Sequence, residues 1–122
     1  MKKILIIDDD DLLRGSIEAC LSQVGFDVST ACNGQIGSEK ALEEPFDLII
    51  TDIVMPDKEG LETIMDIKRQ NPGQRILAMS GGGYVSPDEY LELAQEFGAD
   101  RVLAKPFQLA KMISMVEELT KN

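Results

Sequence analysis

The stretch ILIIDDDD, residues 4–11, passes from four apolar residues directly into four aspartates. A short, continuously apolar run is typical of a strand that is buried on both faces of a sheet. Adjacent aspartates repel one another and favour neither a strand nor the interior of a helix. The stretch therefore predicts a buried strand that ends in an acidic loop, and it raises the question of what offsets the negative charge there.

Three further apolar runs and one alternating segment, FDVST at residues 26–30, follow along the chain, and segments with the spacing of amphipathic helices separate them. The predicted strands are residues 4–7, 26–30, 48–51, 76–79 and 101–104, and the predicted helices are residues 11–24, 34–44, 61–70, 87–97 and 109–121. In the first of these helices, Leu13, Ile17 and Leu21 recur every four residues and lie on one face. Strands that alternate with helices predict a parallel sheet with helices on both faces. With right-handed crossovers, we expect a doubly wound α/β fold, a sandwich of three layers.

The composition is that of one globular domain, which we expect to span residues 1–122. Apolar residues make up 43% of the sequence and charged residues 28%, and the length suffices for one hydrophobic core. The formal net charge is −10, from 22 acidic and 12 basic residues. Nucleic acid phosphates and anionic membrane surfaces repel such a chain, so we expect neither to be a direct partner. A basic partner or a bound cation fits this charge better.

The cysteines and the absence of histidine limit the chemistry of the chain. Cys20 and Cys32 fit reduced thiols better than a disulfide, and no secretory signal or apolar segment of membrane-spanning length is visible. We therefore expect a cytoplasmic location. Without histidine, the chain cannot use Ser-His-Asp, Cys-His or histidine-bound metal chemistry.

The carboxyl ends of the predicted strands hold the candidate functional residues, because ligands of a doubly wound fold bind outside these ends. In chain order these residues are Asp8, Asp9, Asp52, Ser80 and Lys105. Three carboxylates and one lysine leave a charge of about −2, and like charges this close destabilise one another unless a cation lies between them. Mg²⁺ is a hard cation that prefers oxygen ligands. The sequence therefore predicts a Mg²⁺ site, which would offset the charge of the acidic loop.

The same residue types suggest phosphoryl chemistry. A carboxylate beside bound Mg²⁺ can act as a nucleophile and form an acyl phosphate. A lysine and a serine hydroxyl can both bind the oxygens of a phosphoryl group. The other two aspartates of the acidic loop, Asp10 and Asp11, fit a different role, because the helix dipole favours acidic residues in the first turn of a helix.

Four segments together resemble the receiver domain of two-component response regulators. They are LIIDDDD at residues 5–11, LIITDIVMPDKEG at residues 48–60, ILAMSGG at residues 76–82 and GADRVLAKPF at residues 98–107. The resemblance covers residues 3 to about 120. It implies a five-stranded (βα)5 sandwich with the flavodoxin-like strand order 2-1-3-4-5.

The resemblance also implies roles for individual residues. Asp52 would be the nucleophile that accepts a phosphoryl group from a phosphohistidine on a kinase or on a histidine phosphotransfer protein. Asp9 would bind Mg²⁺ directly, and Asp8 would support the ion through water. Asp52 and the backbone carbonyl of Val54 would be further ligands. The chain would catalyse only its own phosphorylation and a slow dephosphorylation.

Two further residues match the family pattern, and two features depart from it. Ser80 and Lys105 stand where the family has a phosphoryl-binding hydroxyl and a lysine, the latter with a cis bond to Pro106. However, Val102 occupies the position of a Tyr or Phe that changes rotamer in many members, so we expect an output without an aromatic switch. Three glycines follow Ser80, which predicts a mobile loop over residues 80–86.

Two alternatives stand beside a phosphorylation-switched receiver. A phosphatase of the haloacid dehalogenase type also forms an aspartyl phosphate, but it needs an acid two residues after the nucleophile, where this chain has Val54. A degenerate receiver would serve only protein contacts, and the intact set of site residues argues against it. The output face would be residues 87–97, 101–104 and 109–121, which could also form a homodimer. The output protein is unknown, and the chain would be a stand-alone receiver or a fragment of a longer regulator.

Overall fold

The computed structural model describes residues 1–53, 59–80, 92, 96 and 98–121. Its helices and strands are, in chain order, β1 (Lys3–Ile7), α1 (Asp11–Val24), β2 (Asp27–Ala31), α2 (Gly34–Glu43), β3 (Leu48–Asp52), α3 (Glu59–Gln70), β4 (Ile76–Ser80), β5 (Arg101–Ala104) and α5 (Leu109–Leu119). All five predicted strands are present. The helix predicted over residues 87–97 and the loop predicted over residues 80–86 lie largely outside the described residues, and so does Val54.

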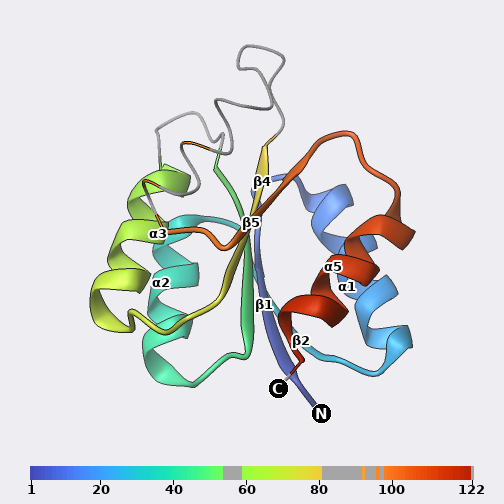
Figure 1. The fold of residues 1–122 in the computed structure, drawn as a ribbon, viewed down its shortest axis with the longest axis horizontal. Coiled ribbons are helices and arrows are strands. Elements are labelled where there is room, and N and C mark those ends of the chain that lie inside the picture. The colour runs from blue at the N-terminus through green and yellow to red at the C-terminus, as the bar shows by residue number, and fades with distance from the viewer. Residues whose placement is uncertain (54–58, 81–91, 93–95, 97, 122) are drawn as a thin grey trace.

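The five strands form one parallel sheet in the order β2-β1-β3-β4-β5. Figure 1 shows this sheet between two layers of helices, with α2 and α3 on one face and α1 and α5 on the other. β1 lies between β2 and β3, where Ile6 is opposite Thr30 on one side and Ile50 on the other. The predicted doubly wound sandwich and its strand order are confirmed.

The alternation of side chains along each strand builds one hydrophobic core on each face of the sheet. On the side of α1 and α5, the buried strand residues are Ile4, Ile6, Leu48, Ile50, Leu77, Met79 and Leu103. On the side of α2 and α3, they are Leu5, Ile7, Ala31, Ile49, Ile76 and Ala78. Because the central strands are buried on both faces, their apolar runs are continuous. Complete burial of one such Ile or Leu contributes about 2 kcal/mol before the entropy of ordering is subtracted.

Three strands extend one residue beyond their predicted ends, β2 to Ala31, β3 to Asp52 and β4 to Ser80. β3 includes Asp52, which is opposite Met79, and β4 includes Ser80, which is opposite Ala104. Pairing with the neighbouring strand continues past the last apolar residue, because backbone hydrogen bonds define a strand and hydropathy only indicates it. The sheet itself, rather than a loop, therefore holds the backbone of Asp52.

The ends of α1 lie where the sequence predicts them. Asp10 caps the first turn, since its carboxylate accepts a hydrogen bond from the backbone N–H of Leu13 at 3.1 Å. Gly25 ends the helix with a φ of 108°, a left-handed conformation that glycine adopts without strain. Within the ranges that the structure describes, no helix is both long enough and apolar enough to cross a membrane.

α2 approaches β1 very closely at Gly37. A Cβ atom placed on this glycine would lie 2.4 Å from the Cδ1 atom of Ile7 and 2.7 Å from its Cγ1 atom. Both residues are buried, and Ile7 is completely inaccessible to solvent. Glycine is therefore needed for the close approach of the helix to the strand that leads into Asp8.

Candidate functional site

The carboxyl ends of β1 and β3 bring three carboxylates together. The two strands are neighbours, and Ile7 is opposite Thr51, so Asp8 and Asp52 follow at the same edge of the sheet. Asp8 is completely buried and Asp52 is 4% exposed, whereas Asp9 is exposed to solvent. Carboxylate oxygens of Asp8, Asp9 and Asp52 all lie within 4.8 Å of one another. The acidic cluster that the strand ends predict is therefore formed.

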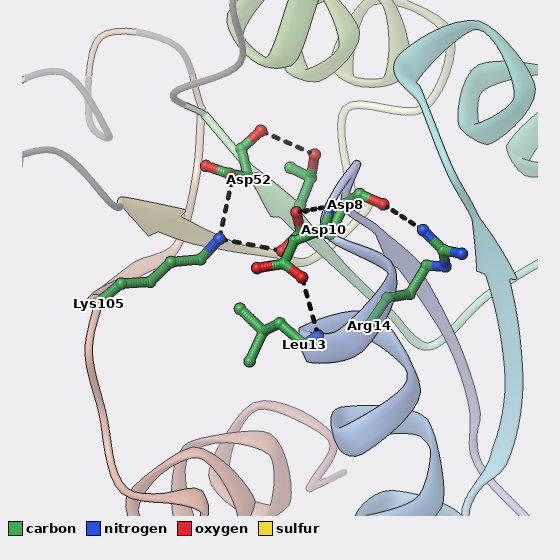
Figure 2. Close-up of polar contacts among 7 residues, drawn as sticks. Asp8, Asp10, Leu13, Arg14, Asp52 and Lys105 are labelled. Carbon is green, nitrogen blue, oxygen red and sulfur yellow. Dashed lines mark hydrogen bonds and ion pairs between the residues drawn. The ribbon is translucent and has the colours of Figure 1, made fainter.

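Lys105 places its ammonium group between the two buried carboxylates (Figure 2). Its Nζ atom lies 2.9 Å from Oδ2 of Asp52 and 3.0 Å from Oδ2 of Asp8, and 17% of its side chain is exposed. Burial alone would lower the pKa of Lys105, but its hydrogen bonds to Asp52 and Asp8 and the charges of both raise that pKa above its ordinary value. The bond between Lys105 and Pro106 is cis, as the resemblance implies.

Backbone groups of β2 and of the β1–α1 loop hold Asp8 in place. The N–H of Asp8 donates to the carbonyl of Ala31 at 3.1 Å, at the end of β2. Its Oδ1 atom accepts a hydrogen bond from the N–H of Asp10 at 3.0 Å. Asp10 is the N-cap of α1 and Asp11 lies in its first turn, which confirms that these two acids belong to the helix terminus. The four aspartates of the acidic loop thus divide into two pairs with different surroundings.

Arg14 also contacts the acidic loop, and the sequence did not predict this. Its Nη1 atom donates to the backbone carbonyl of Asp8 at 2.8 Å, and its Nη2 atom lies 2.6 Å from Oδ1 of Asp11. The side chain is 18% exposed. The spacing of three residues from Asp11 on a predicted helix was the available signal, because residues three apart are neighbours on a helix surface.

The carboxylate cluster fits a divalent cation such as Mg²⁺. Asp8, Asp9 and Asp52 carry three negative charges, and the ammonium of Lys105 offsets one of them. Two of the three carboxylates are buried, where unbalanced charge is costly, while Asp9 opens the cluster to solvent. Mg²⁺ typically binds one or two carboxylates and keeps several water molecules. Ser80 places its backbone at the same edge, as the last residue of β4.

Two hollows lie at opposite edges of the sheet. One, of about 330 Å³, is next to the cluster and is lined by Asp10, Leu13, Lys105, Pro106 and Phe107. The other, of about 270 Å³, is at the amino edge, where Lys2, Asp47 and Arg75 are among its lining residues. None of the predicted site residues lines the second hollow, so the first is the one that opens onto the candidate site.

Comparison with known families decides the class of the protein. The sequence pattern of the response regulator receiver domain matches residues 4–117. The chain belongs to this family. This receiver domain is 31% identical over 119 residues to the response regulator receiver protein CpdR of Brucella abortus, with 98% of this chain and 97% of that protein covered. It is 38% identical to the DNA-binding transcriptional regulator NtrC of Azospirillum brasilense, with 93% of this chain but 23% of that protein covered.

Solved structures agree with this assignment. The chemotaxis protein CheY4 of Vibrio cholerae superposes with a TM-score of 0.87 at 28% sequence identity, and 98% of each chain is covered. The response regulator protein TrrA of Thermotoga maritima, solved in complex with Mg(2+)-BeF, superposes with a TM-score of 0.83 at 28% identity, with 98% of this chain and 99% of that one covered. The function of the chain is therefore two-component signalling rather than metabolic catalysis, and the phosphatase alternative is not supported.

Relatives of this receiver domain differ in length. The chain spans nearly all of CpdR, 52% of the transcriptional regulatory protein CusR of Escherichia coli and 23% of NtrC. Receiver domains thus occur both as nearly the whole of a protein and as one part of a longer regulator. The activities that the longer relatives carry outside their receiver domains are properties of those proteins.

Proposed function

We propose that this receiver domain accepts a phosphoryl group on Asp52 from a phosphohistidine, in a reaction that requires Mg²⁺. One observation carries the proposal: the ammonium of Lys105 lies 2.9 Å from Asp52 and 3.0 Å from Asp8, beside the exposed Asp9. A buried nucleophile, an adjacent cation and an accessible metal ligand are the groups that phosphoryl transfer to a carboxylate needs.

The transfer forms one bond and breaks one. A carboxylate oxygen of Asp52 bonds to phosphorus as the bond between phosphorus and the imidazole nitrogen of the donor breaks. The electrons of the broken bond leave with the imidazole, and the product is an acyl phosphate. This donor histidine must come from a kinase or a histidine phosphotransfer protein, since the chain itself has no histidine.

Asp9 and Asp52 would hold Mg²⁺ directly, with Asp8 acting through water and the carbonyl of Val54 as a further ligand. The ion would supply positive charge against the phosphoryl oxygens. Lys105 stays protonated, because Asp52 and Asp8 raise its pKa, and it can move its hydrogen bond from Asp52 to the new phosphoryl group. Ser80, at the end of β4, would donate its hydroxyl to the same group.

Phosphorylation would then switch a surface that binds an output protein or a second copy of the chain. The expected surface combines residues 87–97 with β5 and α5. Val102 in β5 is partly buried against the core on the side of α2 and α3. Because valine has no ring that could change rotamer, the output would not use an aromatic switch. One receiver domain would occupy residues 1–122 and act in the cytoplasm. Its net charge of −10 disfavours direct contact with nucleic acid.

Phosphoramidate is a direct test, because its phosphorus–nitrogen bond resembles that of the proposed donor. We expect one acid-labile phosphoryl group per chain in the presence of Mg²⁺, and none with Asp52→Asn or after chelation. Arg69→Gln is the matched control, since Arg69 lies in the last turn of α3 and pairs with Asp66. Steady release of nitrophenol from p-nitrophenyl phosphate, without a stable phosphorylated chain, would contradict the proposal and favour a phosphatase.

A further inference from the structure

Arg14 joins α1 to the acidic loop from the side opposite to Lys105 (Figure 2). Its guanidinium donates to the backbone carbonyl of Asp8 at 2.8 Å and to the carboxylate of Asp11 at 2.6 Å. The side chain of Arg14 is 18% exposed, whereas that of Asp11 is 81% exposed. Solvent screens the ion pair with Asp11, so the contact with the Asp8 carbonyl is the better protected of the two.

The carbonyl that Arg14 binds belongs to the peptide unit between Asp8 and Asp9. A peptide unit is planar, so a hydrogen bond that fixes its oxygen also fixes the direction of the backbone at Asp9. The other polar groups of Asp8 are held separately: its N–H by the end of β2, and its side chain by Asp10 and Lys105. Arg14 therefore holds the one polar group of Asp8 that leads directly to Asp9.

We infer that Arg14 is a positioning residue for Mg²⁺ binding, which holds Asp9 in place through the carbonyl of Asp8. The inference rests on the Mg²⁺ site of the proposed function. Groups that orient the ligands of a metal ion without touching the ion commonly contribute a factor of about 10 to 100 to its affinity. Arg14 is such a group, because its contact is with the main chain that leads to the ligand.

Charge and position predict opposite effects for the loss of Arg14. Removing a cation leaves the acidic cluster more negative, and by Coulomb attraction alone Mg²⁺ would then bind more tightly. Removing the hydrogen bond to the Asp8 carbonyl frees the peptide before Asp9, and Mg²⁺ would then bind more weakly. The sign of the change in Mg²⁺ affinity therefore separates the two effects.

The shape of the arginine side chain provides a second test. A guanidinium carries several N–H donors in a rigid fork, which lets Arg14 reach the carbonyl of Asp8 and the carboxylate of Asp11 at once. Lysine keeps the charge but has a single ammonium group. We therefore expect Arg14→Lys to bind Mg²⁺ more weakly than the wild type, although less weakly than Arg14→Gln.

Isothermal titration of Mg²⁺ into the complete chain tests the inference. We expect the dissociation constant of Mg²⁺ to rise about tenfold in Arg14→Gln, as for other residues that orient metal ligands. Arg69→Gln is the matched control, because Arg69 forms an i,i+3 ion pair with Asp66 at 3.4 Å on α3, and its side chain is 71% exposed. This control should keep the wild-type dissociation constant.

An unchanged or lower dissociation constant in Arg14→Gln, or a wild-type value in Arg14→Lys, would overturn the inference and leave the Mg²⁺ site intact. A wild-type chain that does not bind Mg²⁺, or binding that survives Asp9→Asn, would overturn the proposed site and the inference with it. If Arg14→Gln does not fold, Arg14→Lys decides. The amide resonance of Asp9 in the metal-free protein gives an independent readout, which should shift in both Arg14 variants and stay unchanged in Arg69→Gln.

Discussion

The two edges of the sheet carry the same kinds of ionic groups in different arrangements. At the carboxyl edge, Lys105 faces a cluster of three carboxylates, and its side chain is 17% exposed. At the amino edge, two ion pairs each join one cation to one anion, and their side chains are partly or largely solvated. Lys3 pairs there with Glu44, and Arg101 pairs with Glu118, whose side chain is 63% exposed. Each of these two pairs is neutral by itself, whereas one cation faces three carboxylates at the carboxyl edge.

This difference explains why we expect Mg²⁺ binding and phosphoryl transfer at the carboxyl edge of the sheet. Exposed ion pairs contribute about 0–1 kcal/mol each, so these two pairs add little to the stability of the amino edge. A buried group of like charges lowers stability unless a cation joins it. At the carboxyl edge, binding of Mg²⁺ or a change in the charge of one carboxylate should therefore have a large effect on the free energy of unfolding.

The replacement of Lys105 by methionine should break the balance at the carboxyl edge most severely. Asp8 and Asp52 would then face each other without the ammonium that now lies between them. We expect the free energy of unfolding without Mg²⁺ to fall by about 3 kcal/mol, the lower end of the range for a broken buried pair, because Lys105 is partly solvated. Urea unfolding measures this change.

The matched variant at the amino edge is Arg101→Gln, which breaks the ion pair with Glu118. We expect it to lower the free energy of unfolding by less than about 1 kcal/mol, because both side chains are exposed. Equal losses in Lys105→Met and Arg101→Gln would contradict the distinction between the two edges.

Added Mg²⁺ should stabilise the carboxyl edge of the wild-type chain. At a free concentration of 100 times the dissociation constant, we expect the free energy of unfolding to rise by about 2.7 kcal/mol, by mass action on the folded state. Thermal or urea unfolding with and without a chelator measures the increase. Asp9→Asn should lose most of it, and an equal increase in that variant would place the ion elsewhere.

A smaller effect concerns the close contact between α2 and the strand that leads to Asp8. Gly37→Ala puts a methyl group against the buried side chain of Ile7, and we expect a net loss of about 1 kcal/mol after the better helix propensity of alanine is counted. Gly15→Ala in α1 meets no atom within 4 Å, so it should instead stabilise the protein by about 0.5–1 kcal/mol. Shifts of the same sign in the two variants would contradict the close approach at Gly37.

The sequence predicted the fold well because each element has its own local signal. Apolar runs marked four of the five strands, an alternating pattern marked β2, and helical spacing over residues 11–24 marked α1. The strand ends were less predictable, because pairing with a neighbouring strand carries Asp52 and Ser80 into the sheet. Hydropathy reports burial and does not report the length of a hydrogen-bonded ladder.

The sequence predicted which acidic residues and which lysine lie together, but it did not predict all the contacts that hold them in place. Asp8, Asp52 and Lys105 follow from the rule that parallel strands end at one edge. Arg14 does not, because its guanidinium reaches back over the acidic loop, and residue spacing does not specify that rotamer. The need for glycine at Gly37 was equally invisible, since it depends on the distance between a helix and the sheet.

The central claim is that Asp52 accepts a phosphoryl group in a Mg²⁺-dependent reaction, and intact mass spectrometry tests it most directly. The chain is incubated with acetyl phosphate and Mg²⁺, and peptide mapping then locates any modification. We predict a mass gain of one phosphoryl group, located on Asp52, that disappears in Asp52→Asn and with a chelator. A gain that persists in Asp52→Asn, or no gain in a folded wild-type chain that binds Mg²⁺, would contradict the account.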